Sequence, residues 1–310
     1  MKKTLLAVAV AAALPAAAFA QVTLYGVADI AVSKASGDGA TAVFGTDKAQ
    51  MSANGAGNNG NSRLGVKGTE DLGGGLKASF NYEMAVNPEN GNTDSATYQR
   101  AAWMQLDGGF GSLRMGRSLS PSFYGVAAWE LTGTANYSSQ YNTFGAAGGS
   151  SRNNSAWAYT TPNFSGFTAT LGYVTEFDNG GNAKIDANAV YRGGPLVVGL
   201  SYNKVDNTGG AGWGLGAQYN FGMGVVAVSV VDQGDQGKGI KGYTLGGGTK
   251  LGPVAVVLDI ARVTTSGAES TNWLLEGKYP LSKATFAYAT YLRMDAADAS
   301  NVSFGIRHNF

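Results

Sequence analysis

Apolar and polar residues alternate one by one through most of the chain beyond its first twenty residues. In residues 22–33, Leu24 falls on one face of an extended chain and Thr23 on the other. The same alternation recurs in residues 76–84 and 213–221. A period of two predicts β-strands with one apolar and one polar face.

Tight turns and longer loops join these strands alternately. Short segments rich in Gly, Pro, Asn or Asp predict hairpin turns at residues 70–75, 107–111, 161–166, 192–195, 220–224, 250–253 and 280–283. Longer polar segments lie at residues 34–62, 85–97, 118–151, 176–183, 204–211, 233–240, 264–271 and 295–300. Seven hairpins, with a first strand and a last strand over residues 301–310, predict sixteen antiparallel strands.

The strand length and the order of connections predict a membrane barrel. Strands of roughly 9–11 residues cross a bilayer at a tilt, and bacterial outer-membrane barrels pair an even strand count with short turns on one side. The apolar faces must then point outward, because lipid does not solvate charge. A soluble β-sandwich is the competing architecture, but it does not explain one apolar face on every strand. We therefore expect residues 21–310 to form an all-β domain, a 16-stranded antiparallel transmembrane β-barrel.

One strand departs from the pattern. Ala102, Met104 and Leu106 share its apolar face. Its opposite face carries Trp103 beside Gln105. A β-bulge or contact with a neighbouring subunit would explain the large aromatic residue there.

The third long segment, residues 118–151, has no strand pattern over roughly 34 residues and is rich in Gly, Ser, Asn and Ala. It carries one acid, Glu130, and no base. A loop this long in a compact domain is usually functional or disordered. We expect it to fold into the lumen of the barrel and to narrow it; a mobile surface loop is the alternative.

The first twenty residues have the features of a cleaved signal peptide. Lys2 and Lys3 precede an apolar run over residues 5–13, and Ala18-Phe19-Ala20 forms a small-x-small cleavage pattern. This run is too short for a spanning helix, and no later stretch approaches 18 consecutive apolar residues. We expect residues 1–20 to be removed during export.

Composition excludes several kinds of site. The chain has no cysteine, so neither a disulfide framework nor a thiolate metal site is expected. A formal net charge of +1 does not favour a nucleic-acid partner. The single histidine, His308, falls on the lipid-facing side, so no Ser-His-Asp arrangement can be assembled. We expect no enzyme, cofactor or metal, although a barrel lipase and a purely adhesive barrel stay as alternatives.

Charge is distributed unevenly between the two faces. The inward positions carry twelve bases, Arg63, Lys67, Lys77, Arg100, Arg114, Arg152, Lys184, Arg192, Lys250, Lys278, Arg293 and Arg307. They carry five acids, Asp29, Glu83, Asp186, Asp259 and Glu276. Rings of basic side chains favour anions in a pore. Ordinary solvated charge with scattered salt bridges is the alternative.

We expect one part of this charge to form a basic wall of a pore constriction. Its residues are Arg63, Arg100, Arg114 and Arg152, which lie on strands next to the third long loop, together with Lys67. Arginine stays ionised at any relevant pH. Glu130 is the acid that the loop would present opposite this wall.

The chain resembles a general diffusion porin of Gram-negative bacteria, of the trimeric sixteen-stranded β-proteobacterial type. The resemblance rests on residues 22–26, 62–73, 110–117 and 159–167 and on the terminal Phe310, and it covers essentially the whole mature chain. It implies a homotrimer in the outer membrane, surrounded by lipid and lipopolysaccharide. It also implies a third loop folded into each barrel and passive passage of small hydrophilic solutes and inorganic anions.

The resemblance also implies roles for single residues. Arg63, Arg100 and Arg152 match the arginine cluster of the family's constriction, and a terminal Phe is read by the barrel assembly machinery. Family members often place several acids on the third loop, whereas this chain has only Glu130. We therefore expect a weakly anion-preferring, water-filled channel. A substrate-specific channel for phosphate or organic anions is the alternative, because Arg clusters bind these groups well.

Overall fold

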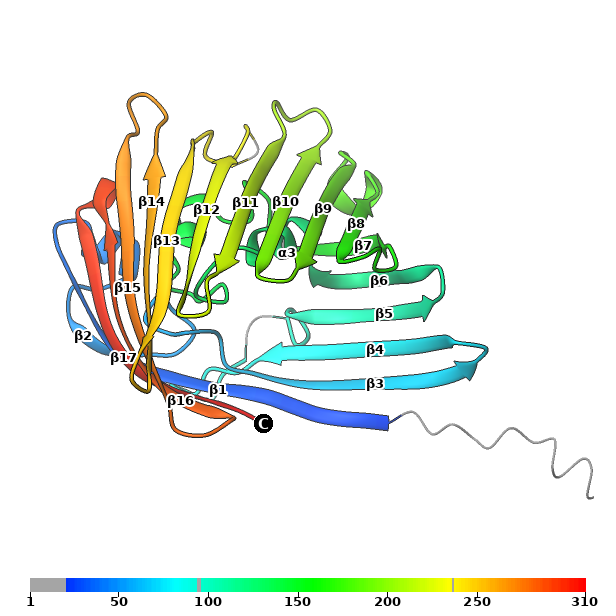
Figure 1. The fold of residues 1–310 in the computed structure, drawn as a ribbon, viewed down its shortest axis with the longest axis horizontal. Coiled ribbons are helices and arrows are strands. Elements are labelled where there is room, and N and C mark those ends of the chain that lie inside the picture. Colours follow the sequence, from blue (N-terminus) through cyan, green and yellow to red (C-terminus); the bar gives the residue numbers. More distant parts are fainter. Residues whose placement is uncertain (1–20, 94–95, 236) are drawn as a thin grey trace, which may run out of the picture.

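The structure, a computed structural model, describes residues 21–93, 96–235 and 237–310 (Figure 1). The expected signal peptide, residues 1–20, lies outside these residues. Among the residues described, no helix has the length and apolar character needed to cross a membrane.

Sixteen long strands within the described residues form one antiparallel sheet that closes on itself. They are β1 (Gln21–Ser36), β3 (Arg63–Gly73), β4 (Leu76–Ala85), β5 (Ala101–Gly108), β6 (Gly111–Leu119), β7 (Arg152–Thr160), β8 (Phe167–Val174), β9 (Lys184–Gly193), β10 (Leu196–Val205), β11 (Gly212–Asn220), β12 (Gly224–Asp232), β13 (Lys241–Leu251), β14 (Val254–Val263), β15 (Ser270–Pro280), β16 (Thr285–Met294) and β17 (Ala299–Asn309). The sequence-based prediction of a sixteen-stranded barrel is confirmed.

Closure depends on the length of β1. Residues 21–27 of this strand pair with β3, and residues 27–36 pair with β17. On the side of β1 that pairs with β3, the ladder continues past Arg63, the first residue of β3. There, residues 31–34 of β1 pair with a short strand that was not predicted, β2 (Ala49–Ser52). β2 covers backbone groups that would otherwise form an open sheet edge. The sequence pattern did not predict this strand, because it lies in a Gly- and Asn-rich loop. The same loop contains α2 (Ala40–Phe44).

The alternation of faces follows the prediction along most strands. Leu215 and Phe304 point outward and are exposed, whereas Ser201 and Thr244 on the inner face are buried. β5 pairs without a shift with both β4 and β6, so the bulge, one of the two explanations for its pattern, is not found in this strand. Met104 is 58% exposed on its outer face, and Trp103 lines a cavity on its inner face.

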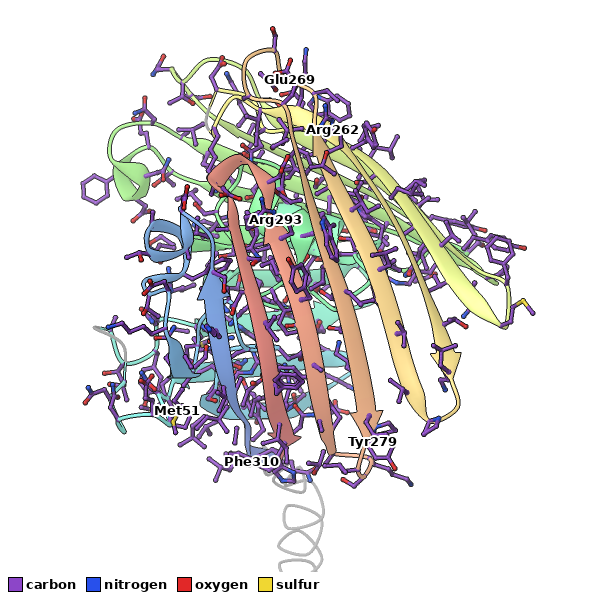
Figure 2. The ribbon with its side chains drawn as sticks, turned by 90° about the vertical axis from the view of Figure 1, so that its left-hand side faces the viewer. Met51, Arg262, Glu269, Tyr279, Arg293 and Phe310 are labelled. Carbon is purple, nitrogen blue, oxygen red and sulfur yellow. The ribbon has the colours of Figure 1, made fainter. Side chains whose placement is uncertain are left out.

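β16 reverses the predicted faces. Tyr288 and Leu292 were expected to face lipid, but they are 4% and 1% exposed and pack in an inner cluster with Tyr137. Arg293 was expected in the lumen and lies instead on the outer face, opposite Trp273 of β15 (Figure 2). The prediction failed because the residues between β6 and β7 bring apolar side chains to this part of the inner wall.

This segment, residues 120–151, contains α3 (Pro121–Ala127) and α4 (Ser139–Phe144). α3 packs against β9 and β10, and α4 packs against β14. The segment places Val126, Trp129 and Phe144 in one buried cluster with Val231 and Ala261 of the sheet. It therefore lies along the inner face of the wall.

Glycines make room for the largest of these side chains. A Cβ atom added at Gly199 or Gly216 would collide with the ring of Trp129. Both residues lie on the inner faces of neighbouring strands, β10 and β11, opposite each other in the register. The absence of side chains there lets the indole lie directly on the sheet.

Candidate functional site

Four arginines line one cavity of about 400 Å³ on the inner wall: Arg63, Arg100, Arg152 and Arg307. Arg63 begins β3, Arg100 precedes β5, and Arg152 begins β7. The structure thus brings together three of the predicted basic residues. Arg307 joins them from β17, because barrel closure places this strand beside β1. We call these four residues the arginine cluster.

One carboxylate accompanies the arginine cluster. The Nε atom of Arg100 donates to Oε1 of Glu83 at 2.7 Å, and the Tyr25 hydroxyl donates to Oε2 at 2.8 Å. Among the residues that the structure describes, no other acid is in ion-pair contact with the cluster. Four guanidinium groups against one carboxylate leave an excess of three positive charges.

The geometry of the cluster is fixed by neutral partners. Arg152 donates from Nε to the backbone oxygen of Arg100 at 2.8 Å. Arg307 donates to Oδ1 of Asn59 at 2.8 Å. These contacts orient the guanidinium groups without cancelling their charge.

The residues of segment 120–151 that face the arginine cluster are neutral. Thr134, Asn136 and Tyr141 of residues 120–151 line the same cavity. Burial raises the pKa of the Tyr141 hydroxyl, so this group stays an uncharged donor. The wall opposite the cations therefore contributes hydrogen-bonding groups rather than negative charge.

Glu130 does not line this cavity, contrary to the expectation from the sequence. Its side chain is buried, and its carboxylate accepts hydrogen bonds from the Thr132 backbone N–H at 3.0 Å and hydroxyl at 2.6 Å. It also accepts from the Thr134 N–H at 2.5 Å and the Ser138 hydroxyl at 2.8 Å. Through these contacts, Glu130 stabilises the turn between α3 and α4.

Arg114 and Lys67 lie on the same side of the barrel but outside the arginine cluster. The Arg114 guanidinium lies over the Trp103 ring, 4.5 Å from its centroid. The Lys67 ammonium lies 4.9 Å from the centroid of the Tyr25 ring. Both residues are nearer than the cluster to the short turns of their hairpins.

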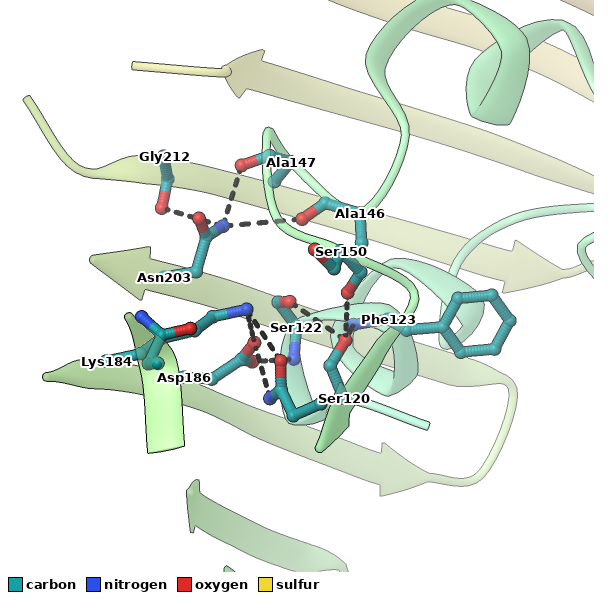
Figure 3. Close-up of polar contacts among 12 residues, drawn as sticks. Ser120, Ser122, Phe123, Ala146, Ala147, Ser150, Lys184, Asp186, Asn203 and Gly212 are labelled. Carbon is teal, nitrogen blue, oxygen red and sulfur yellow. Dashed lines mark hydrogen bonds and ion pairs between the residues drawn. The ribbon is translucent and has the colours of Figure 1, made fainter. Parts of the chain in front are cut away.

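Acids on the inner face mostly anchor loops. Asp186 accepts from the Ser122 backbone N–H at 2.6 Å and from the Asn153 side chain at 3.1 Å, and its carboxylate lies 3.4 Å from the Lys184 ammonium (Figure 3). Asp259 accepts from the Ser139 hydroxyl at 2.5 Å. Asp186 is paired with Lys184, and neither Asp186 nor Asp259 lines the cavity of the arginine cluster.

Both ends of this segment are tied together. The Ser120 hydroxyl donates to the backbone oxygen of Ser150 at 2.7 Å and accepts from the Phe123 N–H at 3.2 Å (Figure 3). The Asn203 side chain donates to the backbone oxygen of Ala147 at 2.8 Å. The path of the segment is therefore fixed at its start and at its end.

The chain terminus lies at the seam of the barrel. The Phe310 backbone N–H donates to Gly26 oxygen at 3.1 Å, and the Gly26 N–H donates back to Phe310 oxygen at 2.9 Å. A Cβ atom on Gly26 would collide with the Phe310 ring. Gly26 therefore lets the terminal ring lie against the first strand.

Sequence reasoning missed two parts of this site. It placed Arg307 on the inner face but did not connect it to Arg63, although closure of a sixteen-stranded sheet brings the last strand beside the first. It also missed the pair of Tyr25 and Glu83, because their contact spans two strands.

Comparison with known proteins gives one consistent answer. A family model described as Gram-negative porin matches residues 6–299. Outer membrane porin protein 32 of Delftia acidovorans is 34% identical, over 97% of this chain and 92% of its own length. An outer membrane porin protein of Bordetella pertussis is 29% identical over the full length of both chains.

Solved structures agree. An anion-selective porin from Comamonas acidovorans superposes with a TM-score of 0.75 at 26% identity, covering 94% of this chain and all of that one. OmpT of Vibrio cholerae, in a trimer form, has a TM-score of 0.69 at 14% identity, covering 94% of this chain and 99% of that one, and supports the fold alone. The chain belongs to the Gram-negative porin family, whose members are outer-membrane channel proteins and not enzymes.

Proposed function

We propose that this porin is a passive, water-filled channel for small hydrophilic solutes with a weak preference for anions. Residues 120–151 narrow its path, and the arginine cluster forms the cationic side of the constriction. The observation that carries the proposal is the excess of three positive charges around a cavity whose opposite side is neutral. The anion-selective porin from Comamonas acidovorans is a precedent in a similar fold.

The charge arrangement explains why the preference is weak rather than absolute. Basic groups raise the local concentration of anions in a narrow passage with low-dielectric walls. Glu83 cancels part of this field beside Arg100. The lumen also holds water, as in other barrels of sixteen to eighteen strands, so cations pass with their hydration shells.

Reversal potentials test the proposal directly. Purified protein in a planar bilayer under a potassium chloride gradient is expected to give stepwise currents, because each barrel holds an open path. The zero-current voltage should shift toward the chloride equilibrium potential. A shift toward the potassium potential would overturn the anion preference, and absence of steps would overturn the channel.

A substrate-specific channel for phosphate or organic anions is the second candidate. It is favoured by Arg63, whose guanidinium makes no hydrogen bond or ion pair within the described residues and so can bind a solute. Guanidinium groups bind phosphate and carboxylate through paired hydrogen bonds. Saturable block of chloride current by submillimolar phosphate would favour this candidate over general diffusion.

The proposal also covers location and assembly. Residues 1–20 would direct export and be removed, and residues 21–310 would insert in the outer membrane as a homotrimer among lipid and lipopolysaccharide. The apolar outer face supports insertion, because Leu24, Leu245 and Phe304 are all exposed there. A heat-sensitive trimer band in detergent electrophoresis would support the oligomer, and a monomer under all mild conditions would reject it.

Phe310→Ala should lower the yield of membrane-inserted barrel several-fold, because we propose that assembly machinery reads the terminal ring. Ile306→Ala is the matched control, since it removes an exposed apolar side chain from the same strand. Fractionated outer membranes measure the yield. Equal losses for both variants would show that only packing on β17 matters.

A further inference from the structure

A row of inner-face side chains crosses four strands just beyond the arginine cluster. In register, Thr23 of β1 lies opposite Lys67 of β3, Lys67 opposite Asn81 of β4, and Asn81 opposite Trp103 of β5. The row lies two residues, about 7 Å, further along the strands than Glu83. A solute that passes the cluster toward the short turns therefore meets this row next.

Trp103 forms a flat surface with Arg114. The guanidinium of Arg114 lies 4.5 Å from the centroid of the indole, and its Nε atom donates to Gln105 Oε1 at 2.7 Å. Gly116 lies opposite Trp103 on β6 and adds no side chain to this surface. Within the described residues, no carboxylate is in ion-pair contact with Arg114, so its terminal nitrogens keep their capacity to donate.

The other side of the row carries a second cation and a second ring. The Tyr25 ring is fixed by its hydroxyl, which donates to Glu83 and whose oxygen lies 2.9 Å from Oδ1 of Asn81. Lys67 lies over this ring and, in the part of the chain that the structure describes, forms no ion pair. Lys67 and Trp103 line one cavity of about 530 Å³.

We propose that this cavity is a solute subsite for small aromatic carboxylates, a specificity that rests on the proposed channel function. The ring of the solute packs on Trp103, whose indole is held by the guanidinium of Arg114, and its carboxylate pairs with Lys67, which lines the same cavity. Guanidinium and indole faces both favour a flat π system. Lys67 and Trp103 lie two strands, about 10 Å, apart at the backbone, which accommodates a single substituted ring between them.

Other solute classes use only part of this arrangement. An inorganic anion pairs with the cations but gains nothing from the indole. A neutral sugar packs on the indole but leaves the Lys67 ammonium without a partner. Only a solute that combines a flat ring with a negative charge uses both, which accounts for a tryptophan in a row whose other members, Thr23, Lys67 and Asn81, are polar.

Single-channel block by two matched acids tests the subsite. Benzoate and cyclohexanecarboxylate have the same charge and similar size, but only benzoate has a π face. In the wild-type protein, benzoate should reduce chloride current at about fivefold lower concentration, as expected for one aromatic contact. Trp103→Ala should bring the ratio of the two blocking concentrations close to one, whereas Trp103→Phe should keep most of the difference.

Trp157→Ala is the control, because this tryptophan is exposed on the outer face of β7. It should retain the wild-type ratio. Equal block by the two acids in the wild-type protein, or an unchanged ratio in Trp103→Ala, would overturn the subsite. Reversal potentials recorded in the same membranes test the anion-preferring channel separately. Loss of chloride preference in the wild-type protein would contradict the channel, whereas retained preference without selective block would contradict only the subsite.

Discussion

Replacing Arg63, Arg100 and Arg152 together with glutamine is expected to abolish the anion preference of the channel. The triple variant leaves Arg307 against Glu83, so the excess of positive charge in the cavity falls from three to zero. Without net charge in the cavity, its field no longer favours either ion. We therefore expect the chloride-to-potassium permeability ratio, measured from reversal potentials in a salt gradient, to fall to about one.

A triple variant with the same loss of charge elsewhere is the control. Arg192 lies on the inner wall outside the cavity of the arginine cluster, and Arg262 and Arg293 lie on the outer face (Figure 2). Replacing these three with glutamine should leave the reversal potential near the wild-type value. If both triple variants shift it equally, net charge and not the cluster sets the preference.

Trp129→Ala is expected to widen the channel without unfolding the barrel. The indole is 1% exposed and packs on Gly199 and Gly216 of the inner wall. Removing a buried Trp costs about 3–5 kcal/mol. Here the loss falls on the attachment of residues 120–151, because the strand ladder does not depend on the indole. Conductance should rise, currents should flicker, and proteoliposomes should admit larger sugars.

Gly216→Leu disrupts the contact between Trp129 and the sheet from the side of the sheet. Its side chain would occupy the position of the indole, so it should displace the segment and raise conductance as Trp129→Ala does. Leu200→Ala, on the lipid-facing side of β10 and next to Gly199, is the control and should conduct as the wild type. Wild-type conductance and sugar exclusion in both Trp129→Ala and Gly216→Leu would show that residues 120–151 do not set the width of the path.

The barrel could be predicted because lipid imposes a simple rule on every strand. One face must be apolar, so period-two alternation alone located the strands and placed Arg63 and Arg100 inside. The rule assumes a wet inner wall. It failed at β16, where Tyr137 from a distant segment packs on Tyr288 and makes the inner face apolar. A contact between residues so far apart leaves no trace in local periodicity.

The contacts of the acidic residues in the site were equally hard to predict from sequence. Glu130 was the only acid in its loop, and sequence alone could not show where its carboxylate points. The nearby hydroxyl residues Thr132 and Ser138 were a local hint, since such side chains often hydrogen-bond within loops. Glu83, the acid that does meet an arginine, was placed inside by parity, but its pairing with Arg100 depends on how the second long loop ends.

The pairing of β1 with β17 constrains the order in which the sheet can form. Val27 pairs with both Arg63 and Asn309, so the first strand gains its second neighbour only when β17 has been made. Contacts between the two ends of a chain form late, since they carry the largest entropic cost of loop formation. The barrel therefore cannot close before β17 is available. A product of interrupted translation that lacks β17 would leave residues 27–36 of β1 without this neighbour and stay open to proteolysis.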